Sequence, residues 1–163
     1  MKKLGIIALL TIFSLSSAMA QLIKVDQEVF GMDCAPCAYG LERGLKKMDG
    51  LESVKVSLND GKAYLKLASD NDLTLQKIQE EVKSNGFSAR NAEVTLIGQL
   101  VKKESEWQIN VNGETFIVSP ETPSEIVKSL NTGEIKATVF VKDKKANHLN
   151  GTWDIRIIEV LKS

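Results

Sequence analysis

The alternation of apolar and polar positions changes period along the chain, and each change marks a predicted element. Over residues 23–29, charged side chains alternate with uncharged ones, which is typical of a half-buried strand. Over residues 37–48, apolar side chains recur every three or four residues, which predicts a helix that ends at Gly50. The first part of the chain therefore begins with a strand followed by a helix.

Alternation and helical spacing predict four more elements up to residue 93. Two alternating segments, 53–58 and 62–67, flank an Asp-Gly pair, which is a strong signal for a β-hairpin. Residues 70–86 predict a second capped helix, and another strand begins near Phe87. The resulting order is strand, helix, strand, strand, helix, strand. This order predicts an α+β fold of the ferredoxin-like βαββαβ type over residues 21–93.

Residues 94–163 predict mainly strands. The predicted strands span 94–101, 107–111, 115–118, 135–141 and 153–160, with a short helix over 123–130. This order is typical of a small five-stranded OB-like β-barrel, although a small antiparallel sheet with one packed helix would give the same pattern. We expect the aromatic residues of this half to be core residues. No proline-rich or serine-rich linker separates the halves, so the two domains are expected to abut.

The first 20 residues have the pattern of a signal peptide. Lys2 and Lys3 precede an apolar stretch, and Ala18 and Ala20 place small residues at −3 and −1 of a cleavage site. The apolar stretch is shorter than the ~20 residues of a membrane-spanning helix. We therefore expect cleavage near Ala20 and a periplasmic or secreted protein that is not embedded in a membrane.

Charge and composition limit the possible functions. The chain is 43% hydrophobic and 26% charged, as in globular proteins. Removing Lys2 and Lys3 leaves 19 basic against 21 acidic residues, a net charge of −2. Because this charge lacks the cationic excess that collects phosphate groups, we expect no nucleic-acid partner. No catalytic triad or phosphate-binding loop is recognisable, so we expect no enzyme.

The two cysteines carry the candidate chemistry. Cys34 and Cys37 lie where the first predicted strand meets the first predicted helix. Unpaired N–H groups at a helix start favour negative charge and so lower the pKa of a nearby thiol. Two thiolates at this spacing suit a soft ion of low coordination number, such as copper(I) or mercury(II). Zinc prefers four ligands, and the single histidine, His148, belongs to the other predicted domain.

The segment Gly31-Met32-Asp33-Cys34-Ala35-Pro36-Cys37 resembles the GMxCxxC loop of the heavy-metal-associated domain family. That family includes copper chaperones, modules of copper-transporting ATPases and periplasmic mercury-binding proteins. The resemblance covers residues 22–95. It implies that Cys34 and Cys37 hold one copper(I) or mercury(II) ion per chain, for transfer or sequestration. It also implies a metal-donor or metal-acceptor partner, such as a membrane transporter.

The resemblance implies roles for three neighbours of the cysteines. Met32 is expected to lie buried beneath the loop without binding the ion, and Phe87 to pack near the ion and shield it. Asp33 departs from the family pattern, because small or hydroxylated residues are usual there. Its negative charge would weaken retention of an anionic bis-thiolate complex.

Two other functions remain open. Cys-Ala-Pro-Cys also resembles the motif of thioredoxin-like proteins, which implies a thiol-disulfide redox module. In an oxidising compartment, the two cysteines would alternatively form a structural disulfide without a metal-binding role. In the other alternative, the barrel binds a protein partner and the first domain is a scaffold.

Overall fold

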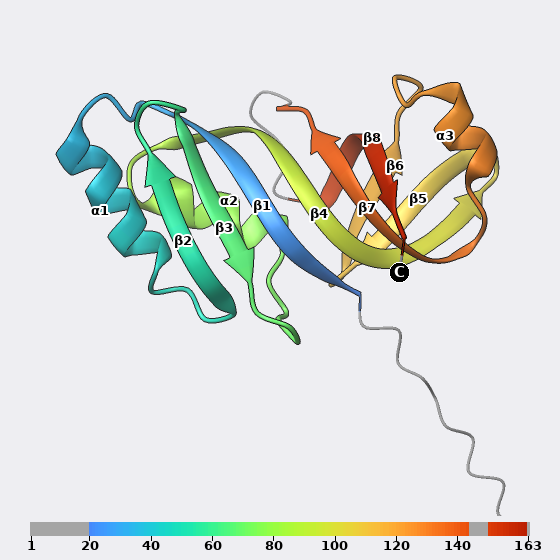
Figure 1. Cartoon of the computed structure of the whole chain (residues 1–163), viewed down its shortest axis with the longest axis horizontal. Helices are drawn as coiled ribbons and strands as arrows, with labels where there is room; N and C mark the ends of the chain where they lie inside the picture. Colours follow the sequence, from blue (N-terminus) through green and yellow to red (C-terminus); the bar gives the residue numbers. More distant parts are fainter. Residues whose placement is uncertain (1–19, 144–149, 163) are drawn as a thin grey trace, which may run out of the picture.

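The computed structural model describes residues 20–143 and 150–162. Apart from Ala20, the expected signal peptide lies outside these residues, and so does His148. Within the described part of the chain there are eight strands and three helices (Figure 1). None of these helices is long and apolar enough to cross a membrane.

The first half has the expected order of elements. Its elements are β1 (Gln21–Phe30), α1 (Ala35–Leu45), β2 (Leu51–Ser57), β3 (Lys62–Leu67), α2 (Leu75–Ser84) and β4 (Ser88–Lys103). The strands lie in the order β2-β3-β1-β4 with antiparallel neighbours, and both helices pack against this part of the sheet. The expected α+β fold is confirmed.

Alternation of side chains produces the core of this half. In β1, Leu22, Val25 and Val29 are buried, whereas the charged residues between them are not. The two helices bury their apolar faces on the same side, with Leu41 of α1 and Ile78 of α2 fully enclosed. Burial of each such side chain stabilises the fold by roughly 1.5–3 kcal/mol.

The strands of the second half, together with β4, form a closed ring. The elements of this half are β5 (Glu106–Val111), β6 (Glu114–Val118), α3 (Ser124–Ser129), β7 (Gly133–Val141) and β8 (Thr152–Leu161). Pairing runs from β4 through β5, β6, β8 and β7 and returns to β4, with β6 and β8 parallel and the other neighbours antiparallel. Phe116 and Trp153 are buried inside this ring of strands.

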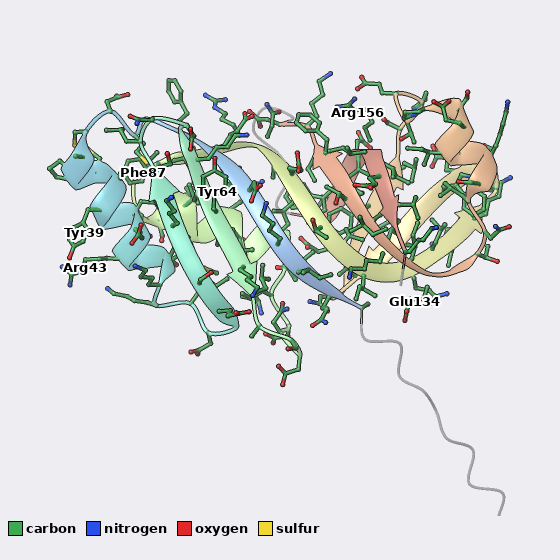
Figure 2. All side chains as sticks on the ribbon, in the orientation of Figure 1. Tyr39, Arg43, Tyr64, Phe87, Glu134 and Arg156 are labelled. Carbon is green, nitrogen blue, oxygen red and sulfur yellow. A yellow bond between two sulfur atoms is a disulfide. The ribbon has the colours of Figure 1, made fainter. Side chains whose placement is uncertain are left out.

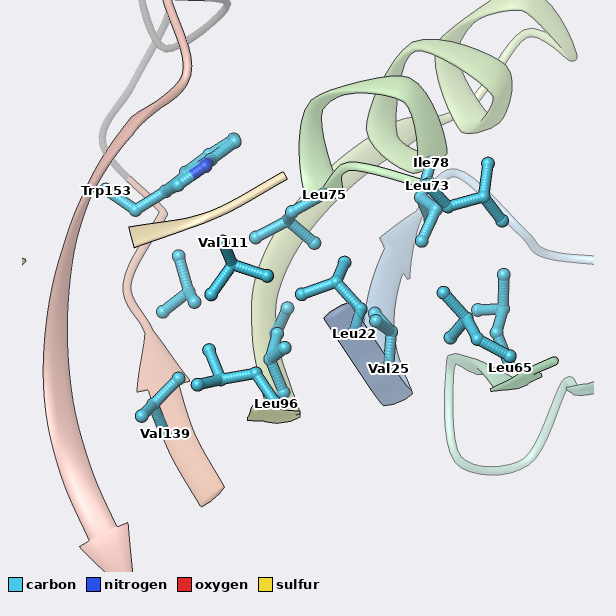
Figure 3. Packing of buried hydrophobic residues seen from close by; sticks show 14 of the residues in the cluster. Leu22, Val25, Leu65, Leu73, Leu75, Ile78, Leu96, Val111, Val139 and Trp153 are labelled. Carbon is cyan, nitrogen blue, oxygen red and sulfur yellow. The ribbon is translucent and has the colours of Figure 1, made fainter. Parts of the chain in front are cut away.

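Strand β4 belongs to both halves. Residues 88–97 pair with β1, residues 92–100 pair with β7, and residues 99–103 pair with β5. The expected domain boundary between residues 93 and 94 falls inside this strand. The buried residues accordingly form one continuous cluster, in which Leu75 lies between Leu22 of β1 and Val111 of β5 (Figure 3).

Gly98 of β4 allows the strands of the second half to approach closely. A Cβ atom at this position would lie 2.5 Å from Cγ2 of Ile109 and 2.7 Å from Cγ2 of Val111. Since both neighbours are fully buried, no space is available for a larger residue.

A buried carboxylate joins the two halves. Glu114, the first residue of β6, accepts hydrogen bonds from the backbone N–H groups of Leu75 (2.7 Å) and Gln76 (2.9 Å), at the start of α2. The same carboxylate accepts a 2.9 Å hydrogen bond from Nε1 of Trp153 in β8. Burial raises the pKa of Glu114, and these three donors act in the opposite direction. Glu114, in the second half, therefore accepts the hydrogen bonds of unpaired N–H groups at the N-terminus of α2, in the first half.

Glu114→Gln is expected to lower the free energy of unfolding by about 1–3 kcal/mol, because an amide nitrogen would face one of the three donors and leave it unpaired. Urea unfolding at neutral pH measures this difference. Glu106→Gln is the control, since Glu106 is exposed and no hydrogen bond or ion pair of its side chain is found in the described part of the chain. Equal stability of the two variants would contradict the assigned role.

Candidate metal site

The cysteine loop connects β1 to α1 through a sharp turn. Gly31 follows β1 with a φ of +91°, a conformation that L side chains rarely adopt. Cys34 is the N-cap of α1, and its extended backbone (φ −143°, ψ 151°) lets the helix begin at Ala35. Pro36 lies in the first turn, where its missing N–H is not needed. Local sequence thus places both cysteines at the start of α1.

The sulfur of Cys34 caps the helix. Its Sγ accepts a 3.1 Å hydrogen bond from the backbone N–H of Cys37, and its carbonyl oxygen accepts from the N–H of Ala38. An anionic sulfur at this position would be favoured by this N–H and by the helix dipole. In the structure, Cys34 and Cys37 are joined by a disulfide bond, which is the oxidised form of the pair. Reduction would place two thiols at this helix terminus.

The other expected site residues lie around the loop. Met32 is 6% exposed and belongs to the core cluster beneath the loop. Phe87 is half-buried and packs close to Gly31: its Cδ1 lies 4.0 Å from the point that a Cβ atom on Gly31 would occupy. It lies at the same end of the molecule as the disulfide (Figure 2). Asp33 is exposed. The structure therefore brings together all five residues predicted for this site.

A buried glutamine fixes the strand that leads into the loop. Gln27 is fully buried, and its Nε2 donates to the carbonyl oxygens of Glu28, Arg90 and Asn91. Its Oε1 accepts from Nε2 of Gln79 in α2. These bonds lie where the register of β1 against β4 shifts, just before the loop. This role of Gln27 was not predicted from the sequence, although an uncharged polar residue on the apolar face of β1 was a signal.

Arg90 connects the loop to the second half. Its guanidinium carbon lies 4.9 Å from the ring centre of Phe30, the last residue of β1, which is 63% exposed. Nη1 of Arg90 is 3.0 Å from Oδ2 of Asp143, directly after β7. Arg90 of β4 therefore links the end of β1 to a residue that follows β7 in the second half.

Glu42 connects α1 to strand β2. Its carboxylate pairs with Lys46 and accepts a 2.9 Å hydrogen bond from the backbone N–H of Val56, on the outer strand β2. The hydrogen bond from Lys46, followed by that from Val56, holds the pKa of Glu42 below its ordinary value. The Val56 N–H lies on an edge strand, and its hydrogen bond to Glu42 gives it a partner. This bond hinders pairing of β2 with a strand of another molecule.

Within residues 20–143 and 150–162, no group of three or more His, Cys, Asp or Glu side chains is arranged to hold a metal ion.

Comparison with known proteins identifies the family. The model of the heavy-metal-associated domain matches residues 28–88, and the chain belongs to this family. A protein of unknown function from Haemophilus influenzae is 31% identical over 90 residues, which are 55% of this chain and 96% of that protein. Copper-transporting ATPase 1 of Mus musculus is 28% identical over 159 residues, covering 79% of this chain but 10% of the ATPase.

Shorter relatives match less than half of this chain. The copper chaperone CopZ of Staphylococcus epidermidis is 26% identical over 70 residues, or 43% of this chain and 96% of the chaperone. Among solved structures, a copper-binding domain from the P-type ATPase HMA7 has 29% identity and a TM-score of 0.39, covering 44% of this chain and 92% of that domain. The chain spans 10% or less of the length of the copper-transporting ATPases that it matches.

Glu42→Gln is expected to flatten the loss of stability in acid. The folded-state pKa of Glu42 lies below its ordinary value of 4.5, so its ionised form stabilises the fold above that pH. This stabilisation is lost as the pH falls through the lowered pKa. Urea unfolding at a series of pH values from 7 to about 3 measures the change. The control is Glu134→Gln, at an exposed position; a Glu42→Gln curve parallel to the wild-type curve would rule the contribution out.

Proposed function

We propose that this chain is a non-enzymatic carrier that binds one copper(I) ion between the reduced thiolates of Cys34 and Cys37. The observation that carries the proposal is the position of both sulfurs at the start of α1, where the Cys37 N–H already donates to the Cys34 sulfur. Membership of the heavy-metal-associated family supports it, as do relatives described as copper chaperones and copper-transporting ATPases.

The chemistry of the donor set favours copper(I) as the cargo. Thiolates are soft ligands, and copper(I) accepts low coordination numbers, so two sulfurs suffice. The proposed ligands are these two sulfurs, and Met32 is not among them because its side chain is buried within the core below the loop. Mercury(II) has the same preferences and is the second ion to test.

Release would proceed by exchange of thiolates. A sulfur of the acceptor adds to the two-coordinate ion, and one copper–sulfur bond to the carrier then breaks, so the ion is never released to water. Cys34 would meet the acceptor first, and Cys37 would leave last. The exposed carboxylate of Asp33 adds negative charge beside an anionic complex, which favours release over retention.

Oxidation would switch the carrier off. Copper(I) requires thiolates, and the disulfide of the structure provides none. A dithiol reductant would supply two electrons and two protons, giving two thiols on this chain and a disulfide on the reductant. The proposed signal peptide over residues 1–20 would direct the chain to the periplasm or outside the cell, where such reduction is needed.

The second half would serve as a docking or assembly domain. We assign residues 94–163 to an OB-type barrel, and residues 21–93 to the metal-binding domain. Support for the barrel comes from the ring of five paired strands, with its single parallel contact between β6 and β8 and with α3 between β6 and β7. A metal donor or acceptor, such as a membrane transporter, is the proposed partner.

Thiol-disulfide exchange is the competing function. The disulfide of the structure and the proline between the cysteines favour it. It predicts that the metal-free chain turns over disulfide substrates, which a copper carrier need not do.

A competition titration tests the copper proposal. The reduced chain, kept free of oxygen, is titrated with copper(I) in the presence of a chromophoric chelator. The wild type is expected to remove one equivalent from the chelator, and Cys34→Ser and Cys37→Ser each to lose this ability. Met32→Leu is the matched control, because a buried residue of similar volume should preserve both fold and binding.

Failure of the reduced wild type to compete would contradict the copper proposal. The same sample would then be titrated with mercury(II) and assayed for disulfide turnover, which distinguishes a carrier of another soft ion from a redox module.

A further inference from the structure

The helix-free face of the first sheet contains a hollow. Strands β2, β3 and β1 bury one face under α1 and α2, and the other face points toward the viewer in Figure 1, with α2 behind it. On this open face lies a hollow of about 310 Å³, whose lining includes Ile23 of β1, Ser53 of β2 and Tyr64 of β3. Tyr64 is labelled on β3 in Figure 2. Because the solvated face of an antiparallel sheet is normally polar, a hollow with apolar walls is unusual there.

Two β-bulges flank the hollow. The register of β1 against β4 shifts between Leu22 and Lys24, so Ile23 is an extra residue, and it lines the hollow on the open face. The register of β2 against β3 shifts between Leu51 and Ser53. Bulges bend a strand and redirect a side chain, and they are frequent beside functional sites. Here they place an isoleucine on a face that is otherwise exposed to solvent.

Three lysines surround this apolar surface. Lys24 of β1 and Lys66 of β3 are directly opposite each other in the sheet, and Lys55 of β2 is directly opposite Tyr64. All three lysines line the hollow. Like charges at directly opposite positions destabilise a pair of strands. The stability of the sheet therefore does not account for the placement of Lys24 against Lys66.

Two of the lysines have a carboxylate partner. Nζ of Lys24 is 2.7 Å from Oδ2 of Asp26, and Nζ of Lys66 is 2.7 Å from Oε1 of Glu52. Neither of these carboxylates lines the hollow. Since an ammonium group has three N–H donors, each of these lysines keeps donors that its partner does not use.

Lys55 has a free charge. Among residues 20–143 and 150–162, no ion pair of Lys55 is found. Its charge contributes to lowering the pKa of Glu42 and of Asp60, but these carboxylates accept hydrogen bonds from other groups, including the N–H of Val56 and the hydroxyl of Tyr64. Three lysines and two paired carboxylates thus leave one positive charge at the hollow, which is complementary to a single negative charge.

We propose that this hollow binds a small molecule with an apolar body and one carboxylate or sulfonate group. The apolar body lies against Ile23 and the Tyr64 ring, and the anionic group accepts hydrogen bonds from Lys55 and from the unused donors of Lys24 and Lys66. The volume is at the lower end of the range for small-molecule sites, which favours such a ligand over a protein segment. The inference is independent of copper, because no residue of the cysteine loop lines the hollow.

A titration with dodecanoate tests the proposal. Residues 21–163, oxidised and free of metal, are titrated below the concentration at which dodecanoate forms micelles, by calorimetry and by NMR of the backbone amides. We expect saturable binding of one dodecanoate per chain. The largest amide shifts are expected at residues 23–24, 53–55 and 64–66. Dodecan-1-ol, which has the same chain length and no charge, is expected to bind much more weakly.

Variants separate the contributions of charge and apolar surface. Lys55→Glu is expected to weaken dodecanoate binding about tenfold, because an attractive charge becomes a repulsive one. Ile23→Thr keeps a branched side chain in the strand but removes apolar surface, and it should also weaken binding. The matched control is Lys83→Glu, since Lys83 is an exposed lysine of α2, on the other side of the sheet. Circular dichroism checks that each variant is folded.

Four results would overturn the proposal. They are the absence of saturable binding, equal binding of dodecan-1-ol, equal effects of Lys55→Glu and Lys83→Glu, and amide shifts centred elsewhere. Binding to vesicles of anionic phospholipid without binding of dodecanoate would also overturn it, in favour of a membrane surface as the partner. Copper is absent throughout, so this outcome and that of the copper titration are independent.

Discussion

One uninterrupted strand, β4, takes part in both halves of the molecule and fixes how they are joined. Its first residues complete the sheet that carries α1 and α2, and its last residues close the ring of strands in the second half. A strand paired on both sides cannot bend freely, so the two halves are held at one orientation. The carboxylate of Glu114 adds a second connection at the start of α2, and Arg90 adds a third beside Asp143. The cysteine loop is thus part of one connected structure in which both halves hold fixed positions, and it does not belong to a small domain on a flexible tether.

That connected structure also fixes the position of the cysteine loop. Gln27 holds the end of β1 through three backbone carbonyl groups, and Gly31 then turns the chain toward α1. Because Cys34 is the N-cap, the same backbone N–H that stabilises the helix also stabilises negative charge on sulfur. The capping bond is present in the oxidised chain, so reduction is expected to change the sulfur chemistry without requiring a new backbone arrangement. The proposed binding and release of a soft ion would then take place at a helix terminus that is already formed.

Most of the secondary structure could be predicted from the sequence, because alternation and helical spacing are local properties. The position of the cysteine pair between a strand and a helix could be predicted for the same reason, whereas its chemistry stays a prediction. The continuity of β4 could not be predicted in this way: its alternation runs past residue 93, but the partner strands on each side lie far away in the chain. Glu114 was missed for a related reason, as Asn112-Gly113-Glu114 has the composition of an exposed turn and its burial depends on α2 and Trp153. The oxidation state of the cysteines is likewise set by their surroundings and not by their spacing.

The proposed copper site requires that two sulfurs of one chain suffice to hold the ion. X-ray absorption spectroscopy at the copper edge of the reduced, copper(I)-loaded chain tests it directly, at a protein concentration at which sedimentation gives the mass of a monomer. Two sulfur neighbours around copper and no nitrogen or oxygen neighbour are expected, because Cys34 and Cys37 are the proposed complete ligand set. A copper ion surrounded by nitrogen or oxygen atoms, or by three or more sulfurs in the monomer, would contradict it.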